Sequence, residues 1–219
     1  MSLLNLMKNY PKTKRSEFFH RSEELTAEEI NIAKSFGREY FDGERKFGLG
    51  GYYYNPKFFT RVAQDLFNHY ELKKDAHILD VGCGKGFMLY DFQRQYPFLS
   101  VAGLDISEYC YENCLPSVKP FFKLGSCDYL PYADNTFDLV ISIATIHNLD
   151  VDGVKRSLRE IERVGKGKSF IKVNGYLTDD EKKALKGWNL VANTILHQEE
   201  WFQLFDEVGY TGDFEFFTP

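Results

Sequence analysis

From His77 onward, short apolar runs alternate with amphipathic stretches of helical length, and this alternation limits the possible folds more than any other feature of the chain. Such alternation is typical of βα units, which build a parallel sheet. We expect strands at residues 77–81, 101–105, 121–124, 137–143 and 169–173. Helices are expected between them at residues 88–96, 108–113 and 151–164. The predicted fold class is therefore α/β, with a mostly parallel sheet and helices on both faces.

The residues before this alternation predict helices and an irregular loop. Thr26 and Glu29 have the spacing of a capping box, and apolar residues recur behind them at helical spacing, so we expect a helix over residues 27–40. Four glycines and a cluster of aromatic residues then interrupt regular structure in residues 41–54. This segment is predicted to be a loop.

A further helix is expected to begin at Asn55 and Pro56, because Asn is a good N-cap and Pro fits the first helical turn. Its apolar face predicts an end near Tyr70. We therefore divide the chain into an N-terminal helical and aromatic-loop lid, residues 1–75, and an α/β domain, residues 76–219.

Composition argues against several classes of partner. The chain has 27 Lys and Arg against 32 Asp and Glu, a formal net charge of −5, so it lacks the positive field that holds nucleic acid. A small basic cluster, Lys8, Lys12, Lys14 and Arg15, is interpreted as a solvated surface. No apolar run approaches the ~18 residues of a membrane span, and no signal peptide is recognisable. We expect a cytoplasmic protein without nucleic-acid or membrane partners.

The four cysteines carry no metal signature. Cys83, Cys110, Cys114 and Cys127 form no C-x-x-C pair and have no histidines at matching spacing. This pattern argues against a structural zinc site and against a disulfide scaffold. We expect no metal.

A glycine loop follows the first predicted strand. Gly82, Gly84 and Gly86 permit a tight turn at the start of a helix, where a ligand can approach the backbone closely. A dinucleotide site needs a third glycine where Phe87 stands, and a phosphate loop needs a Ser or Thr after the lysine, which Lys85 lacks. The loop therefore favours a nucleotide-like ligand that has no pyrophosphate.

Asp105 ends the second predicted strand, 19 positions after Gly86. An acidic side chain at this place can accept hydrogen bonds from both hydroxyls of a ribose. Ribose recognition without a phosphate site points to an unphosphorylated nucleoside.

Three successive segments, ILDVGCGKG at 78–86, AGLDIS at 102–107 and DNTFDLV at 134–140, together resemble the motifs of class I S-adenosylmethionine-dependent methyltransferases. The resemblance covers roughly residues 78–173. It implies a Rossmann-like fold, S-adenosylmethionine as cofactor and S-adenosylhomocysteine as product. It also implies cofactor contacts at three strand ends: Asp80, Gly82, Cys83, Gly84 and Gly86 in the loop, Asp105 and Ile106 after the second strand, and Cys127, Asp128 and Tyr129 after the third. Asp128 is alternatively a turn residue before Leu130 and Pro131.

The fourth strand is expected to carry His147 to the crevice at the carboxyl ends of the strands. A neutral imidazole there is the best-placed general base, able to contribute ~10²–10⁴-fold. The alternative is a polar wall or a helix cap. Nucleic-acid amino-methyltransferases of similar fold carry Asn/Asp-Pro-Pro-Tyr/Phe at this place, and this chain has Ala144-Thr145-Ile146-His147 instead.

The acceptor pocket is expected to be aromatic. Tyr52, Tyr53 and Tyr54 follow a glycine-rich stretch, and this segment is either a lid over the acceptor or an ordinary packed loop. Tyr176, after the fifth strand, is a further candidate contact. The resemblance alone suggests a small-molecule acceptor, such as a sugar or an amine of bacterial surface or secondary metabolism.

The carboxyl end departs from the family pattern, in which an antiparallel hairpin completes the sheet. We expect a helix near residues 199–208 and a strand near 213–217, which leaves little chain for a hairpin. Either residues 189–196 supply an edge strand or the final strand is missing. An exposed edge can pair with a second copy, so a homodimer stays open.

Three functional hypotheses result from these observations. The leading one is methyl transfer to an O or N atom of a small molecule. The second is a non-catalytic sensor or scaffold that binds S-adenosylmethionine. The third is a protein or RNA methyltransferase, for which the composition shows no docking surface.

Overall fold

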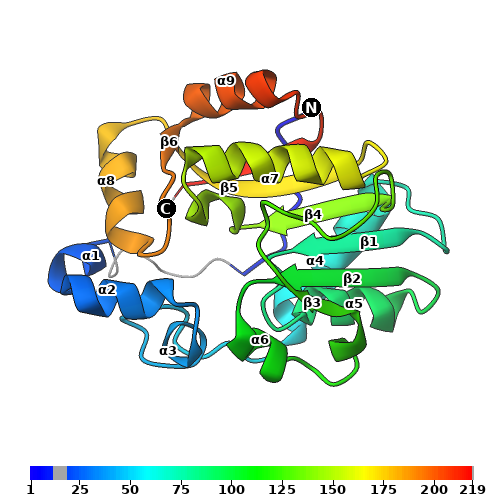
Figure 1. Cartoon of the computed structure of the whole chain (residues 1–219), viewed down its shortest axis with the longest axis horizontal. Coiled ribbons are helices and arrows are strands. Elements are labelled where there is room, and N and C mark those ends of the chain that lie inside the picture. The colour runs from blue at the N-terminus through cyan, green and yellow to red at the C-terminus, as the bar shows by residue number, and fades with distance from the viewer. Residues whose placement is uncertain (12–18, 219) are drawn as a thin grey trace.

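The computed structural model describes residues 1–11 and 19–218, and within them a seven-stranded sheet lies between layers of helices (Figure 1). Lys12, Lys14 and Arg15 of the basic cluster lie outside the described residues. The strands are β1 His77–Val81, β2 Ser100–Asp105, β3 Phe122–Leu124, β4 Leu139–Ile143, β5 Ser169–Tyr176, β6 Leu196–His197 and β7 Asp213–Phe217. The α-helices are α1 Arg21–Glu24, α2 Ala27–Lys34, α3 Arg38–Phe41, α4 Pro56–His69, α5 Phe87–Gln95, α6 Glu108–Glu112, α7 Val151–Val164, α8 Asp179–Trp188 and α9 Gln198–Val208.

The sheet has the order β3-β2-β1-β4-β5-β6, with β7 also paired to β5, and every strand pair in the described part of the chain is parallel. This confirms the predicted α/β class and the mostly parallel sheet. Because all carboxyl ends meet at one edge, the loops that follow β1, β2, β4 and β5 gather there. The sequence motifs therefore converge in space.

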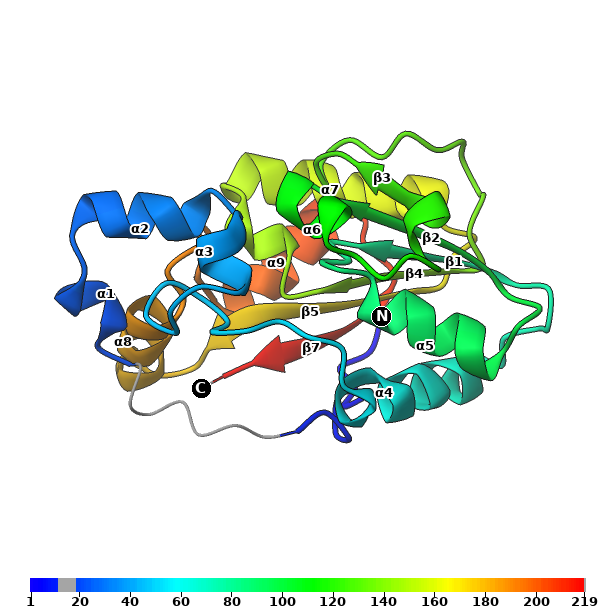
Figure 2. The same ribbon diagram turned by 90° about the horizontal axis from the view of Figure 1, so that it is seen from below.

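Side chains alternate between the two faces of the sheet. Ile78 faces the core made with α4 and α5, whereas Leu79 faces the core made with α7 and α9. Figure 2 shows these two helical layers on opposite sides of the sheet. The predicted helices on both faces are thereby confirmed.

Local signals at helix starts were reliable. The Thr26–Glu29 capping box forms, and Asn55 caps α4, which ends before Tyr70 as expected. The predicted single helix over residues 27–40 is wrong, however, because it divides into α2 and α3. Phe36 adopts φ of +50°, a left-handed conformation that interrupts the helix, and Gly37 caps α3.

Four strand boundaries also differ from the prediction, and the smallest difference is that β2 begins one residue earlier, at Ser100. β3 begins at Phe122 because η2, Lys119–Phe121, is a 3₁₀ turn, and β4 begins at Leu139. β5 continues to Tyr176, so this residue lies within the strand and not after it. β5 is longer than predicted because new neighbours pair with its carboxyl half.

Those neighbours complete the sheet. Of the two alternatives for residues 189–196, the first is confirmed only at its last residue, because Leu196 belongs to the two-residue edge strand β6. β7 pairs with residues 170–174 of β5, and β6 pairs with Gly175 and Tyr176. On the other side of β7, the amide of Leu4 donates to the carbonyl of Phe214 at 2.9 Å, and the amide of Phe214 donates to the carbonyl of Ser2 at 3.0 Å. The chain therefore covers part of this edge itself.

The helices α1, α2 and α3 lie at the carboxyl-end side of the sheet, near α8 (Figure 1). Ala33 of α2 packs with Leu190 and Val191, which follow α8. None of the helices in the described residues has the length and apolarity needed to cross a bilayer.

Candidate active site

The glycine loop after β1 is a left-handed turn. Gly82, Gly84 and Gly86 have φ of +81°, +54° and +73°, where side chains are strained. A Cβ on Gly82 would lie 2.0 Å from Oγ1 of Thr145, the residue that precedes η3, Ile146–Asn148. Glycine is therefore required both by the backbone conformation and by the close approach of the loop after β4.

Asp105 holds the glycine loop. Its Oδ2 accepts the amide of Gly84 at 2.7 Å, and its Oδ1 accepts the amide of Ser107 at 2.9 Å. Burial raises the pKa of Asp105, and these amide donors act in the opposite direction. Each oxygen keeps a free lone-pair direction for a ligand hydroxyl, so the carboxylate fits the expected ribose contact.

Asp80 is the second buried acid of the site, at 4% exposure. Burial, with a smaller contribution from nearby Asp105, raises the pKa of Asp80 to about 8. The side chain is thus mostly protonated at neutral pH and can donate a hydrogen bond. Cys83, the next loop residue predicted as a contact, is also buried, and burial raises the pKa of its thiol.

The predicted cofactor contacts after β2 and β3 differ in exposure. Ile106 and Tyr129 present large apolar surfaces to solvent at the carboxyl edge, at 59% and 74% exposure, whereas Cys127 is buried. Asp128 accepts hydrogen bonds from Ser126 at 2.5 Å and from both Nε and Nη2 of Arg156 at 3.1 and 2.9 Å. These donors lower its pKa, the hydroxyl of Ser126 having the largest effect. An adenine amino group would have to share Asp128 with Arg156.

The three lid tyrosines point to different places. Tyr52 packs over Gly84, and Tyr53 is exposed at 71%. The hydroxyl of Tyr54, which lies just before α4, donates to Asp91 of α5 at 2.8 Å. This hydrogen bond joins the start of α4 to α5. The structure therefore brings Tyr52 to the glycine loop but does not gather all three rings around one pocket.

Sequence reasoning missed an ionic contact between this loop and the glycine loop. The ammonium of Lys85 donates to Asp42, and the hydroxyl of Tyr109 donates to the same carboxylate at 2.6 Å. The sequence signal for this contact was the position of Lys85 between two glycines. A lysine in a tight turn before a buried helix has little access to solvent, so its ammonium needs a partner within the protein.

His147 lies in η3 at 1% exposure. Its Nδ1 accepts the amide of Asn174 at 3.3 Å, its Nε2 lies 3.3 Å from Nδ2 of Asn189, and its carbonyl accepts the amide of Thr194 at 3.0 Å. Burial lowers the pKa of His147 to about 3. Protonating this imidazole at pH 7 therefore costs ~5 kcal/mol, at ~1.36 kcal/mol per unit. Geometry and solvation favour the polar-wall interpretation over the base.

Tyr176 is buried at the end of β5, where its ring meets His197 edge-on at 5.4 Å and the ammonium of Lys182 at 4.9 Å. Its role as an acceptor contact stays a prediction. A hollow of about 470 Å³ lies nearby between α2 and α8, and Lys182 and Lys186 are among its lining residues.

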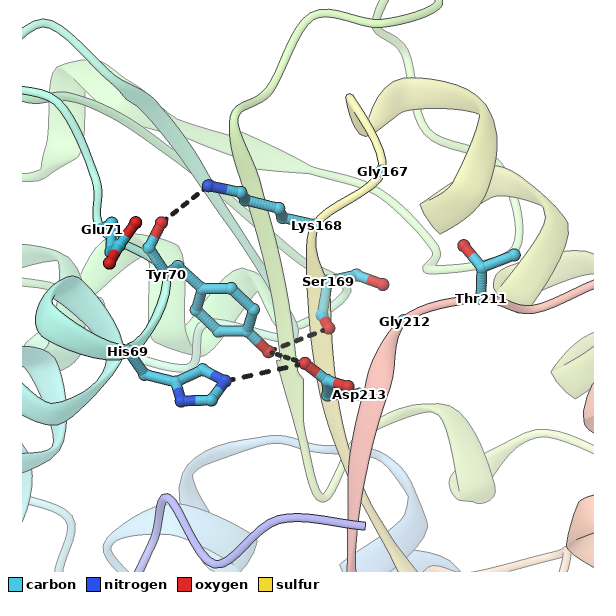
Figure 3. A pocket seen from close by; sticks show the side chains of 9 residues that line it. All are labelled: His69, Tyr70, Glu71, Gly167, Lys168, Ser169, Thr211, Gly212 and Asp213. Carbon is cyan, nitrogen blue, oxygen red and sulfur yellow. Dashed lines mark hydrogen bonds and ion pairs between the residues drawn. The ribbon is translucent and has the colours of Figure 1, made fainter. Parts of the chain in front are cut away.

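A second hollow, of about 340 Å³, lies at the opposite edge, where β5 and β7 begin (Figure 3). The hydroxyl of Tyr70 is within hydrogen-bond distance of the carbonyl of Ser169 and of Asp213, and Lys168 donates to the carbonyl of Tyr70 at 2.7 Å. These groups satisfy one another and join α4 to the strands. No group of His, Cys, Asp and Glu able to hold a metal ion occurs within residues 1–11 and 19–218.

Comparison with known proteins agrees with this geometry. Residues 79–171 match a family model described as a methyltransferase domain. Malonyl-[acyl-carrier protein] O-methyltransferase of Legionella pneumophila is 28% identical over 187 residues, covering 80% of this chain and 60% of that protein. The mitochondrial arginine-hydroxylase NDUFAF5 of Mus musculus is 31% identical over 107 residues, covering 48% of this chain and 29% of that protein.

A solved structure, a putative methyltransferase from Bacillus halodurans, has the same fold with a TM-score of 0.54 and 18% identity, covering 67% of this chain and 68% of that one. Fold and motifs thus define a Rossmann-like methyltransferase domain. Over residues 79–171 the chain is similar to the class I S-adenosylmethionine-dependent methyltransferase family.

Proposed function

We propose that the protein transfers a methyl group from S-adenosylmethionine to an O or N atom of a small molecule, such as a sugar or an amine. The observation that supports this most directly is the contact between the ends of β1 and β2, where the buried carboxylate of Asp105 accepts the amides of Gly84 and Ser107. The left-handed glycines form the turn between β1 and α5, and Thr145 and the ring of Tyr52 pack against Gly82 and Gly84. No pyrophosphate-binding residues accompany them.

The residues present fit such a cofactor, which when bound supplies an electrophilic methyl group on a sulfonium. Asp105 would orient the ribose hydroxyls, and the glycine loop would fix the distance of the ligand from β1. Ile106 and Tyr129 offer apolar surface for the base. In-line transfer requires reacting atoms held ~3–3.5 Å apart, and such positioning supplies ~7–11 kcal/mol in favourable cases.

Deprotonation of the acceptor separates two classes of substrate. An ammonium group whose pKa lies three units above neutral pH costs ~4 kcal/mol to deprotonate, and an alcohol whose pKa lies six units above costs ~8 kcal/mol. Because His147 is desolvated and surrounded by amide donors, it is poorly suited to take up this proton. Positioning therefore carries more of the proposed catalysis than base chemistry does, which favours an amine.

Other functions remain as alternatives with distinct signatures. The relatives' names cover an O-methyltransferase and an arginine hydroxylase, so likeness alone transfers no substrate to this chain. A sensor or scaffold would bind S-adenosylmethionine without turnover. A protein or RNA methyltransferase would form a tight complex with its macromolecule, and an acidic chain has no general affinity for RNA.

The test begins with calorimetric titration of the protein with S-adenosylmethionine, S-adenosylhomocysteine and NAD, repeated on Asp105→Ala. We expect both adenosyl ligands to bind, NAD not to bind, and the variant to bind more weakly. Methyl-labelled S-adenosylmethionine is then incubated with sets of amines and sugars. Failure of both adenosyl ligands to bind would refute the proposal, and binding without transfer to any acceptor would support the sensor.

A further inference from the structure

The loop between α3 and α4 is joined to the glycine loop by a buried ion pair. Lys85 stands between Gly84 and Gly86, and its side chain is 5% exposed. Its ammonium donates to Asp42 at 2.5 Å and to the carbonyl of Tyr52 at 3.0 Å.

Asp42 is the centre of the contact. Its carboxylate accepts the ammonium of Lys85, the hydroxyl of Tyr109 at 2.6 Å and the amide of Tyr52 at 2.8 Å. Burial, the largest single influence, acts to raise the pKa of Asp42, but the three donors together lower it. A desolvated carboxylate with this many donors has one stable arrangement. It fixes the amide of Tyr52 directly, and it fixes the carbonyl of Tyr52 through the ammonium of Lys85.

The fixed backbone sets the ring of Tyr52 over the glycine turn. A Cβ on Gly84 would lie 2.9 Å from Cε1 and 3.1 Å from the hydroxyl oxygen of Tyr52. The ring also packs on Phe87 at 4.7 Å between centroids. Among residues 1–11 and 19–218, no hydrogen bond involves the Tyr52 hydroxyl, although a phenol in such a setting usually finds a partner.

The charges divide the site into two ends. Asp105 attracts hydroxyl donors at the end of β2, whereas the backbone amides at the start of α5 favour an anion beside Gly84. The ammonium of Lys85 is neutralised by Asp42 and adds no net charge there. S-adenosylmethionine has one anionic group, the carboxylate of its amino-acid end. The side chain placed to donate to that carboxylate is Tyr52.

We propose that Tyr52 is a cofactor-binding residue that contacts the amino-acid end of S-adenosylmethionine, and that Asp42 and Lys85 are positioning residues that hold it there. This inference rests on the proposed function. It assigns Tyr52 to the cofactor and not to the acceptor, and it makes the N-terminal segment part of the cofactor site.

Two probes separate this role from general support of the fold. S-adenosylhomocysteine has the amino-acid end, and 5′-methylthioadenosine lacks it while keeping adenine and ribose. We expect Tyr52→Phe to weaken S-adenosylhomocysteine binding about tenfold or more, the usual loss for a hydrogen bond to a charged group, and to leave 5′-methylthioadenosine binding unchanged. Tyr96→Phe is the control, because the ring of Tyr96 stacks on Phe67 of α4 and Tyr96 is not a predicted contact of either ligand.

The positioning residues are tested by the pair Asp42→Asn and Lys85→Met in one chain, since removing one partner alone leaves a buried charge and endangers folding. The control is Lys166→Met, which breaks a surface contact to Asp138. We expect the double variant to keep its circular dichroism spectrum and to lose affinity for S-adenosylhomocysteine selectively, as Tyr52→Phe does.

The outcomes are distinct. If the wild-type chain binds neither probe, the proposed function fails. If it binds both, and Tyr52→Phe weakens both equally or neither, the assignment of Tyr52 is overturned. If Tyr52→Phe is selective but the folded double variant keeps the wild-type ratio of the two affinities, Asp42 and Lys85 are not positioning residues.

Discussion

His147 should make the stability of the protein depend on pH. Its folded pKa is lowered from 6.5 to about 3 by burial. Between these two values the unfolded chain binds a proton that the folded chain does not, so stability is fully present above pH 6.5 and falls as pH falls. The loss totals ~5 kcal/mol by pH 3, at ~1.36 kcal/mol per unit. About 2 kcal/mol of it falls between pH 7 and pH 5.

The assay is urea unfolding at pH 7, 6 and 5 for the wild-type chain and for His147→Gln, which keeps an amide able to face Asn174 and Asn189. Comparing the change in unfolding free energy between the two proteins cancels other titrating groups. We expect the variant to be less stable at pH 7 but to lose ~2 kcal/mol less on going to pH 5. His20→Gln is the control, since its side chain is 62% exposed.

Parallel stability curves for wild type and His147→Gln would refute this reasoning. They would mean that His147 is solvated and titrates normally, as a general base in an open crevice does. In that case His147→Ala should lower kcat by ~10²-fold or more with cofactor affinity unchanged. If the curves differ as expected, turnover should persist in a folded His147 variant.

Three further outcomes follow from the strand ends. Asp105→Ala should weaken S-adenosylhomocysteine binding, which calorimetry measures. It should also lower the unfolding free energy, measured by urea titration, by ~1–3 kcal/mol for each of the Gly84 and Ser107 amides left without an acceptor. Gly82→Ala, which would place a methyl against Thr145, should unfold the chain or abolish binding, whereas Gly167→Ala, at φ +87° in open space, should cost only ~1 kcal/mol. Asp80→Asn should stabilise the protein by about 4 kcal/mol at pH 7 but not at pH 4. The reason is that a pKa near 8 makes the folded acid keep a proton that the unfolded acid, with a pKa of 3.8, releases. Wild-type stability therefore falls as pH rises from about 4 to 8. An equal pH dependence of stability in both proteins would contradict this prediction.

Much of the fold was readable because its signals are local. The capping box at Thr26 and the cap at Asn55 each depend on residues within one helical turn. The same kind of signal misled at residues 27–40. There the left-handed Phe36 is held by a distant partner, the Ser107 hydroxyl, which donates to its carbonyl at 2.6 Å.

The sequence by itself indicated the alternation of strands and helices and the resemblance to class I S-adenosylmethionine-dependent methyltransferases, because periodicity, capping signals and the spacing of the glycines to Asp105 are local features of the chain. Only the tertiary structure decided the environment of each side chain. It buried His147 among amides, turned Tyr54 toward Asp91 and brought Lys85 to Asp42, 43 positions away. Solvation and long-range pairing set pKa values and contacts, and neither is a property of neighbouring residues in sequence.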